Sequence, residues 1–468
     1  MADLPAVARS RLRARRWDAI VVGGALPGLV AAARLCMDGQ RVLVIEEEAA
    51  ARAFPPLREP FLLAGAGSGG VLAVLLRELS VPLIDARRLE PDPLAYQVVL
   101  PEARIDVGGI ARTGEELVTW GLAKPDVVQP LLRALARSSA AERDALLASP
   151  VVRAAGLRRL GRGPAQPTRH ARGMPVEAAT PPPELAPFFE AQVRVLSNLD
   201  RADPGPEARA RLLGSALDGG AAFPSAEHSL RGLLRERILA LHGEFRTLPG
   251  AFELVAADGE PGLAPARSAE LWLGRVLVLN AHRGLLARLL READLAVPPL
   301  LDAPAPARRR AVVHLRTRRE VIPSGMARRV VRLIDPLRPA DGTNVLGIAL
   351  HPLAAGSDAV HLIASAVVEA DDPEPARREA EIEDAVRALM PFSEGRLARQ
   401  PGFHPRWDDD AALEDPAPGA AWPAEVEIRA ASRPPVYALA RSALGGLGAE
   451  GDLLLGWRAG ERIAADLG

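Results

Sequence analysis

Apolar runs and glycine-rich turns alternate most regularly near the start of the chain. An apolar run at residues 19–22 leads into the turn Gly23-Gly24-Ala25-Leu26-Pro27-Gly28. A helix of small residues and a second apolar run, which ends at Glu46, follow this turn. A strand, a glycine turn, a helix and a strand in this order are typical of a dinucleotide-binding unit. The pattern therefore predicts an α/β fold that begins with such a unit.

The residues of this turn predict how a dinucleotide would be held. Gly23 allows the tight turn, Gly28 lets the helix pack closely on the strand, and the helix start offers free N–H groups to a pyrophosphate. Glu46 is placed to accept hydrogen bonds from a ribose, which favours FAD or NAD over NADP because the acid would repel NADP's extra phosphate. The turn departs from G-x-G-x-x-G at Ala25, which replaces the glycine that lets the backbone approach the phosphates.

Further along the chain, the pattern returns to α/β elements after a long helical region. Residues 71–79 read as a helix, and residues from about 100 to 220 are mostly helical in pattern. A helix that begins at Ser229 is expected to end with Gly243 as its C-cap. Short strands are then expected at 244–248, 251–256 and 276–279. This late return indicates that the nucleotide-binding domain resumes after an insertion.

A second group of strands follows without intervening helices, which predicts an antiparallel sheet and a second domain. These strands are expected at 311–315, 330–334, 345–350 and 360–368. A helix ending near residue 389 comes next, with Asp372 as its expected N-cap. Near the C-terminus a second glycine turn, residues 445–451, opens a last helix and again offers N–H donors to an anionic group.

Taken in order, these features resemble the FAD-dependent phytoene desaturase, carotenoid isomerase and amine oxidase superfamily. The stretch 95–106, AYQVVLPEARID, is similar to the desaturase branch. The resemblance covers most of the chain, and its motifs are sharp at the two ends. It implies a Rossmann-like FAD-binding domain with an interleaved α+β substrate domain that contains the antiparallel sheet. The FAD-binding domain would comprise residues 17–100, 220–300 and 430–468, and the substrate or cap domain 101–219 and 301–429, after an N-terminal extension of residues 1–16.

The resemblance also implies a set of cofactor-binding residues. The first turn and Glu46 would hold the pyrophosphate and the adenosine ribose, and the strand near Ala251 would pass the adenine. The last turn would cover the flavin, with N–H groups near Glu450 and Gly451 facing the N1–C2=O edge, where negative charge develops on reduction. The implied FAD-binding residues are Gly23, Gly24, Ala25, Gly28, Glu46, Ala251, Gly446, Gly448, Glu450 and Gly451.

Three departures from the family pattern keep a second hypothesis open. The first is Ala25. The second lies after the ribose acid, where residues 49–60 lack the Gly-Gly pair and its basic residue, so that Arg58 or the glycine loop 65–70 is the candidate substitute. The third is Ala440-Arg441, which replaces the family's Gly-Asp. The alternative hypothesis is therefore a degenerate, flavin-free member that acts as a binding or scaffold protein, and NAD(H) as the bound nucleotide is a third.

The expected reaction follows from the same resemblance. Amine oxidation in this superfamily uses a lysine near flavin N5, and Lys124, the chain's only lysine, falls in the helical insertion. This position indicates a surface residue and disfavours an amine substrate. The desaturase and isomerase branches instead act on an apolar, often isoprenoid, substrate, with hydride transfer to flavin N5. The sequence indicates no catalytic residue.

The amino-acid composition limits the kinds of binding partner and the cellular location that are expected. A net charge of −1 over 468 residues gives no reason to expect nucleic acid. The single cysteine, Cys36, excludes an internal disulfide and fits a reducing compartment, so a cytoplasmic location is expected, and Cys36 itself is expected to be a packed thiol. Peripheral membrane contact and the oligomeric state stay open.

Other reactive groups give weaker patterns. The eight histidines lack metal-ligand spacing, so no metal is expected. His404 precedes Asp408, Asp409 and Asp410, a carboxylate cluster of the kind usually found in a solvated loop. Ser68 lacks the G-x-S-x-G frame of a hydrolase nucleophile.

Overall fold

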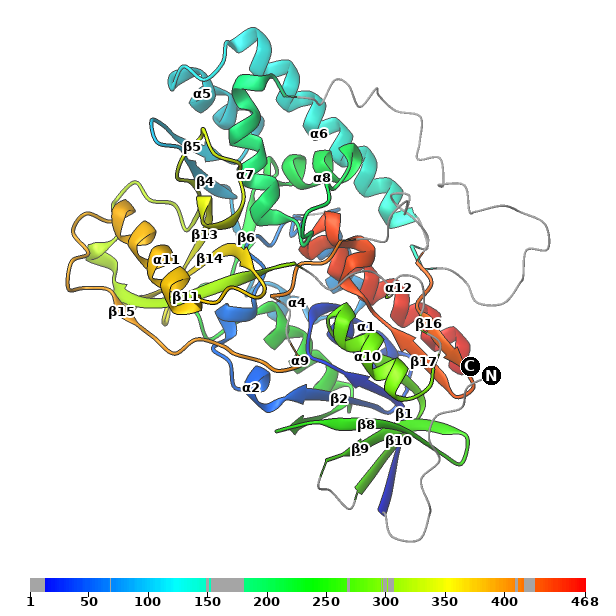
Figure 1. Ribbon diagram of the computed structural model, residues 1–468. Helices are drawn as coiled ribbons and strands as arrows, with labels where there is room; N and C mark the ends of the chain where they lie inside the picture. The colour runs from blue at the N-terminus through cyan, green and yellow to red at the C-terminus, as the bar shows by residue number, and fades with distance from the viewer. Residues whose placement is uncertain are drawn as a thin grey trace.

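The computed structural model describes residues 13–67, 69–148, 151–152, 181–266, 270–295, 297, 301, 307–408, 411–415 and 426–468. Ser68, Asp409 and Asp410 lie outside these residues. Two large sheets dominate the fold, with a helical region beside the second one (Figure 1). The mixed α/β class predicted from the sequence is confirmed.

The first sheet has the strand order β16-β17-β10-β1-β2-β7 and is parallel except for the β16–β17 pair. Its strands are β1 (Arg13–Val22), β2 (Val42–Glu47), β7 (Glu244–Leu248), β10 (Glu270–Leu279), β16 (Arg429–Ser432) and β17 (Pro435–Ala438). An antiparallel extension pairs β8 (Phe252–Ala257) with β9 (Glu260–Pro265), and β9 with β10. Helix α1 (Leu26–Met37) joins β1 to β2, as the opening pattern predicted.

Both faces of the first sheet are covered, which explains why its strands are continuous apolar runs. Side chains alternate between the two faces along a strand. Ala19 and Val21 pack with α1, α9 (Leu230–Ala240) and α12 (Ala449–Leu467). Ile20 and Val22 pack with α10 (Arg283–Glu292) and the β8–β9 hairpin. Helix α3 (Val71–Glu78) joins the α1 face.

The second sheet has the order β15-β11-β14-β13-β12-β4-β5 and is antiparallel except where β12 meets β4. Its strands are β4 (Tyr96–Val99), β5 (Arg104–Val107), β11 (Arg308–Arg318), β12 (Arg329–Leu333), β13 (Val345–Pro352), β14 (Ala359–Glu369) and β15 (Ala398–Arg399). Strand β4 therefore pairs here, although it precedes the boundary placed at residue 100. Helix α11 (Pro375–Leu389) covers one face through Ile382 and Val386.

The helical region expected between about 100 and 220 is present in the described residues. It contains α5 (Ile110–Thr119), α6 (Pro125–Ala148), α7 (Ala186–Leu196) and α8 (Pro206–Ala216). The remaining short elements are α2 (Glu48–Ala51), α4 (Leu83–Ala86), β3 (Glu90–Asp92) and β6 (Gly220–Ala222). Lys124 is exposed at the start of α6, as expected for a surface residue.

Both helix caps predicted from the sequence are wrong, whereas the helix expected to begin at Ser229 does begin there. The Ser229 side chain accepts the N–H of Gly232 and caps α9. At the other end of α9, His242 and not Gly243 takes the left-handed conformation, with φ of 65°. Gly243 is needed for space instead, because a Cβ there would lie 2.4 Å from Ile238 Cγ2. Helix α11 begins later than expected, with Glu374 as its N-cap, while Asp372 accepts the N–H of Glu374.

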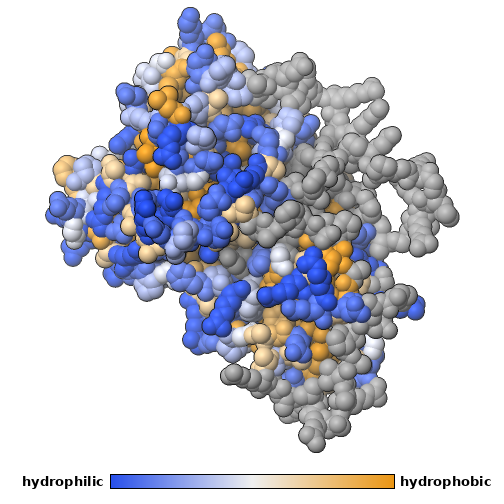
Figure 2. Space-filling model, viewed as in Figure 1, coloured by the Kyte–Doolittle hydropathy of each residue, from blue (hydrophilic) through white to orange (hydrophobic). Residues whose placement is uncertain are grey.

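In the described residues, no helix combines the length and apolar character needed to cross a bilayer. Hydrophilic side chains dominate the face seen in Figure 2, and hydrophobic ones form small patches among them.

Candidate functional site

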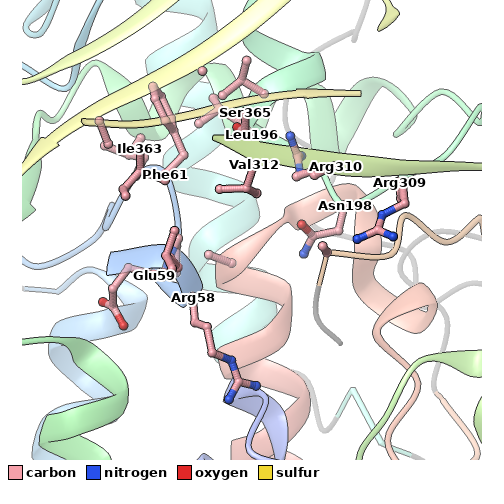
Figure 3. A pocket seen from close by; sticks show the side chains of 18 of the residues that line it. Arg58, Glu59, Phe61, Leu196, Asn198, Arg309, Arg310, Val312, Ile363 and Ser365 are labelled. Atoms are coloured by element: carbon pink, nitrogen blue, oxygen red, sulfur yellow. The ribbon is translucent and has the colours of Figure 1, made fainter. Parts of the chain in front are cut away.

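A cavity of about 620 Å³ lies between the first glycine turn, the start of α12 and the second sheet. Residue alternation on the second sheet explains its wall. One face carries the apolar core under α11, and the other turns Val312, Ile363 and Ser365 toward the cavity. Figure 3 shows these strands crossing on one side, with Arg58 and Glu59 on the other. The cavity thus joins the two ends of the chain that the sequence singled out.

The first glycine turn is held against the end of β10. Gly23 has φ of +108°, and a Cβ on it would lie 1.8 Å from the carbonyl oxygen of Asn280. A Cβ on Gly28 would lie 2.2 Å from Asn280 Nδ2. The same amide donates to the carbonyl oxygens of Gly23 and Ala25, at 3.2 and 3.0 Å. Asn280 was not singled out from the sequence, although it directly follows a buried strand at the edge where such sheets bind ligands.

The N–H of Gly24, which a pyrophosphate would use, already has an anionic partner. It donates to Asp408 Oδ2 at 2.9 Å, and Arg58 donates to Asp408 Oδ1 at 3.0 Å. The Asp408 side chain is 1% exposed and that of Arg58 4%. The expectation of a solvated carboxylate loop is therefore wrong for Asp408, because its charge is satisfied internally. Arg58, the candidate substitute for the family's basic residue, does lie at the glycine turn.

The acid expected to bind a ribose is also engaged. Glu46 is buried at the end of β2 and pairs with Arg235 on α9. Its Oε1 would lie 2.6 Å from a Cβ built on Gly24, so it lies directly beside the turn, as the pattern predicted. The guanidinium of Arg235 in turn lies 3.9 Å above the ring of Phe245.

The neighbouring acid, Glu47, binds a segment from far along the chain. Its carboxylate accepts the N–H groups of Arg406, Trp407 and Asp408 at 2.7 to 3.0 Å. The Trp407 ring is buried and meets Phe252 edge-on at 5.2 Å between centroids. Segment 403–408 therefore crosses the carboxyl end of the first sheet, where α/β sheets of this type bind ligands. Nothing in the local sequence of this segment indicated its position.

The residue expected near the adenine lies close by. Ala251 is exposed just before β8, and its carbonyl oxygen accepts the N–H of Ala266. The next residue is Phe252, which meets Trp407.

The second glycine turn packs tightly on protein. A Cβ on Gly448, where φ is +58°, would lie 2.0 Å from the Leu196 carbonyl oxygen, and one on Gly451 would lie 2.2 Å from that of Leu444. A Cβ on Gly446 would lie 3.3 Å from the Cβ of Pro204. Helix α12 begins at Ala449, inside the glycine turn 445–451. Its first free N–H groups therefore belong to residues of this turn, including Glu450 and Gly451, as the sequence predicted.

Charged side chains near the start of α12 are mostly paired. Glu450 accepts two hydrogen bonds from Arg211, both at 2.6 Å. Asp452 pairs with Arg441, which stands where the family has an acid. Both Glu450 and Asp452 line the cavity.

Two arginines on β11 differ from the other cations of the cavity. Within the described residues, no carboxylate is within ion-pair distance of Arg309 or Arg310, and Arg310 donates only to the carbonyl oxygens of Arg194 and Ser197. Burial, with Arg441 and Arg194 nearby, lowers the pKa of Arg310 to about 10. It therefore stays a cation at neutral pH. The cavity therefore combines apolar walls with charged side chains of both signs, of which Arg309 and Arg310 have no carboxylate partner among the described residues.

Three histidines form a cluster on the cavity face of the second sheet. His314 Nε2 and His361 Nδ1 are 2.7 Å apart, so one ring donates and the other accepts. Phe54 stacks on His314 at 4.8 Å between centroids. Burial, with nearby cations and histidines, lowers the pKa of His351 to about 3 and that of His361 to about 4, and burial lowers the pKa of His314 as well.

These depressed pKa values predict a pH-dependent stability. The histidines take up protons on unfolding, so the free energy of unfolding should fall as the pH drops from about 6.5 toward 4, by at most about 1.4 kcal/mol per pH unit for each histidine. Urea denaturation between pH 7.5 and 4.5 measures this slope. We expect His361→Gln to reduce the slope. Equal slopes for the wild type and His361→Gln would contradict the prediction.

Other reactive groups of the described residues are structural. Cys36 is buried on α1, and burial raises the pKa of its thiol to about 12, as expected for a packed cysteine. No group of three or more potential ligands among the described residues could hold a metal ion.

The donor set of this site suits FAD. A Cβ on Gly23 or Gly28 would meet Asn280, and one on Gly24 would meet Glu46, so these glycines allow close packing within the chain. The Asp408 carboxylate shows that the Gly24 N–H binds an anionic group. The cavity extends from Leu26 of this turn to the start of α12. The adenosine end of FAD would fit beside Gly24 only if segment 403–408 moved away from the turn.

Comparisons with known proteins support the fold. The sequence matches no protein-family model and no curated protein. An oxidoreductase from Methanosarcina mazei is 16% identical and similar over 94% of this chain and 98% of its own, with a TM-score of 0.53. A triple variant of putrescine oxidase with redesigned cofactor binding is 12% identical and similar over 97% of this chain and 100% of its own, with a TM-score of 0.59.

A third solved structure agrees. Cyclohexylamine oxidase from Brevibacterium oxydans is 13% identical over 96% of this chain and 99% of its own, with a TM-score of 0.54. Identities this low establish the fold alone. The chain therefore has the fold of these oxidoreductases over nearly its whole length.

Proposed function

We propose that this protein is an FAD-dependent oxidoreductase of the phytoene desaturase or isomerase type. The observation that carries the proposal is the cavity that reaches from Leu26, in the first glycine turn, to the start of α12 under the second sheet. The pyrophosphate would take the N–H groups of the Gly23–Gly28 turn, and Glu46 would receive the ribose. FAD would supply the hydride acceptor.

The cavity walls support an apolar substrate. Phe61, Val312 and Ile363 are among the apolar side chains that would exclude water from it (Figure 3). Arg309 and Arg310, which lack carboxylate partners among the described residues, favour a substrate that also carries an acidic group, because a buried cation is stabilised by an anion. Lys124, the only lysine of the chain, does not line the cavity. It therefore cannot take the position that a lysine has in amine oxidation, which argues against an amine substrate.

A specific observation favours the second candidate, a flavin-free binding protein. The Gly24 N–H, Glu46 and Glu47 all have partners within the chain. A protein of this kind would keep the cavity as a ligand site and use the glycine turns only as architecture. The same apolar, acid-bearing ligands would then bind without being oxidised.

The absorption spectrum of the purified protein, before and after incubation with FAD, separates the two candidates. We expect flavin bands that reach about one FAD per chain after saturation, because the donors of the site suit a dinucleotide. Flavin reduction is then followed with pairs of apolar compounds that differ by one carboxylate, and the acidic member of each pair should react faster. A protein that never retains FAD would establish the flavin-free alternative.

A further inference from the structure

We propose that segment 403–408 is an internal occupant of the adenosine end of the dinucleotide site, which FAD must displace in order to bind. The inference rests on the proposed function and adds a competition within the chain. Three anchors, each at a position that an ADP moiety would need, carry it.

The first anchor is ionic. Asp408 Oδ2 accepts the Gly24 N–H at 2.9 Å, and Asp408 Oδ1 accepts from Arg58 at 3.0 Å. A phosphate that approaches this turn meets a buried carboxylate of the same sign, and the repulsion between them is strong where water is excluded. Once Asp408 leaves, Gly24 and Arg58 both face the incoming phosphate as donors. The same two groups therefore serve either occupant.

The second anchor is a carboxylate that holds the backbone of the segment. Glu47 accepts the three consecutive N–H groups of residues 406–408. Glu47 directly follows Glu46, so the segment crosses the end of β2 beside the acid expected to bind the ribose. A ribose bound to Glu46 and the backbone of Trp407 would require the same space.

The third anchor is aromatic. The Trp407 ring is 5% exposed and packs against Phe252, the first residue of β8 and the neighbour of Ala251. It presents a flat bicyclic group where the resemblance puts adenine. Its Nε1–H is buried and has no hydrogen-bond partner in the described structure. Such an unsatisfied buried donor costs free energy. The state in which segment 403–408 fills the site is therefore less stable than the burial of Trp407 alone would suggest.

The segment is suited to leave. It contains no helix or strand, and Arg406 is exposed while Phe403 and His404 line the cavity. Segments outside helices and strands open at lower free energy than the core elements do. Its departure would extend the cavity to Gly24. The apparent dissociation constant of FAD then equals the intrinsic one divided by the fraction of molecules in which the segment is out.

Titrations with FAD and with ADP, which covers only the disputed end, test the competition. We expect Asp408→Ala and Trp407→Ala to bind both ligands at least about ten-fold more tightly than wild type, since each removes one anchor of the occupant. Asp18→Ala is the matched control. It removes a carboxylate that accepts the N–H of Arg41 at the amino end of β2, at the opposite end of the parallel strands from the glycine turn, and should leave both affinities unchanged.

Hydrogen–deuterium exchange of the wild-type protein gives a second test that needs no variant. The N–H groups of residues 406–408 should exchange faster when FAD or ADP is added, which is opposite to the usual protection by a ligand. Equal affinities of wild type and variants, or unchanged exchange with FAD bound, would overturn the competition and leave the proposed function intact. If neither wild type nor the variants bind FAD or ADP, the proposed function fails as well, and the segment is permanent core.

Discussion

Gly23→Ala is expected to destabilise the protein by roughly 3 kcal/mol or more and to abolish flavin retention. A Cβ at this position would lie 1.8 Å from the Asn280 carbonyl oxygen, and the backbone there has φ of +108°. Strain at such a φ costs about 1–3 kcal/mol, and overpacking costs about 1–3 kcal/mol more. Urea denaturation measures the loss of stability, and the flavin content of the purified variant measures retention.

Gly250→Ala is the matched control for this substitution. Gly250 has no positive φ, and a Cβ there would meet no atom within 4 Å. Its stability should stay within about 1 kcal/mol of wild type. If Gly23→Ala were as stable as Gly250→Ala and kept its flavin, the turn would not have the tight geometry described, and its place at the centre of the site would be lost.

Arg211→Met is expected to cost about 3 kcal/mol, because it leaves the largely buried Glu450 carboxylate without its partner. The Arg211 and Glu450 side chains are 3% and 13% exposed, and two hydrogen bonds of 2.6 Å join them. Arg211 also donates to Ser139 of α6 at 2.7 Å, so the pair ties the first turn of α12 to the helical region. Thermal or urea denaturation measures the loss.

Two further variants make this expectation specific. In Arg211→Met/Glu450→Leu no charge is stranded, so much of the stability should return. Arg377→Met breaks an exposed pair with Glu381 on α11 and should cost no more than about 0.5 kcal/mol. A similar small effect for Arg211→Met and Arg377→Met would show that the Glu450 pair does not hold α12 in place.

Much of the fold could be predicted from local pattern alone. The turn at Gly23 and the apolar runs around it specify a parallel βαβ unit, because a covered strand must be apolar throughout and the turn needs glycine at fixed places. The strands β11 to β14 of the second sheet were predicted at the right places, since one face packs under α11 and the other borders the cavity. Strand β11 extends three residues beyond its expected bounds at each end, and β4, β5 and β15 were not predicted. Helix ends were less certain: at His242 a non-glycine residue adopts the left-handed conformation while Gly243 is needed for space, which periodicity does not reveal.

What the sequence by itself determined is therefore the class of fold, the position of its glycine turns and the acid at Glu46. What only the tertiary structure decided is which groups fill the site those residues form. Asp408 lies 384 residues from Gly24 along the chain, and nothing local to either residue specifies their hydrogen bond. Local pattern encodes backbone geometry, which repeats over a few residues, whereas the partner of a buried charge is fixed by packing of distant segments.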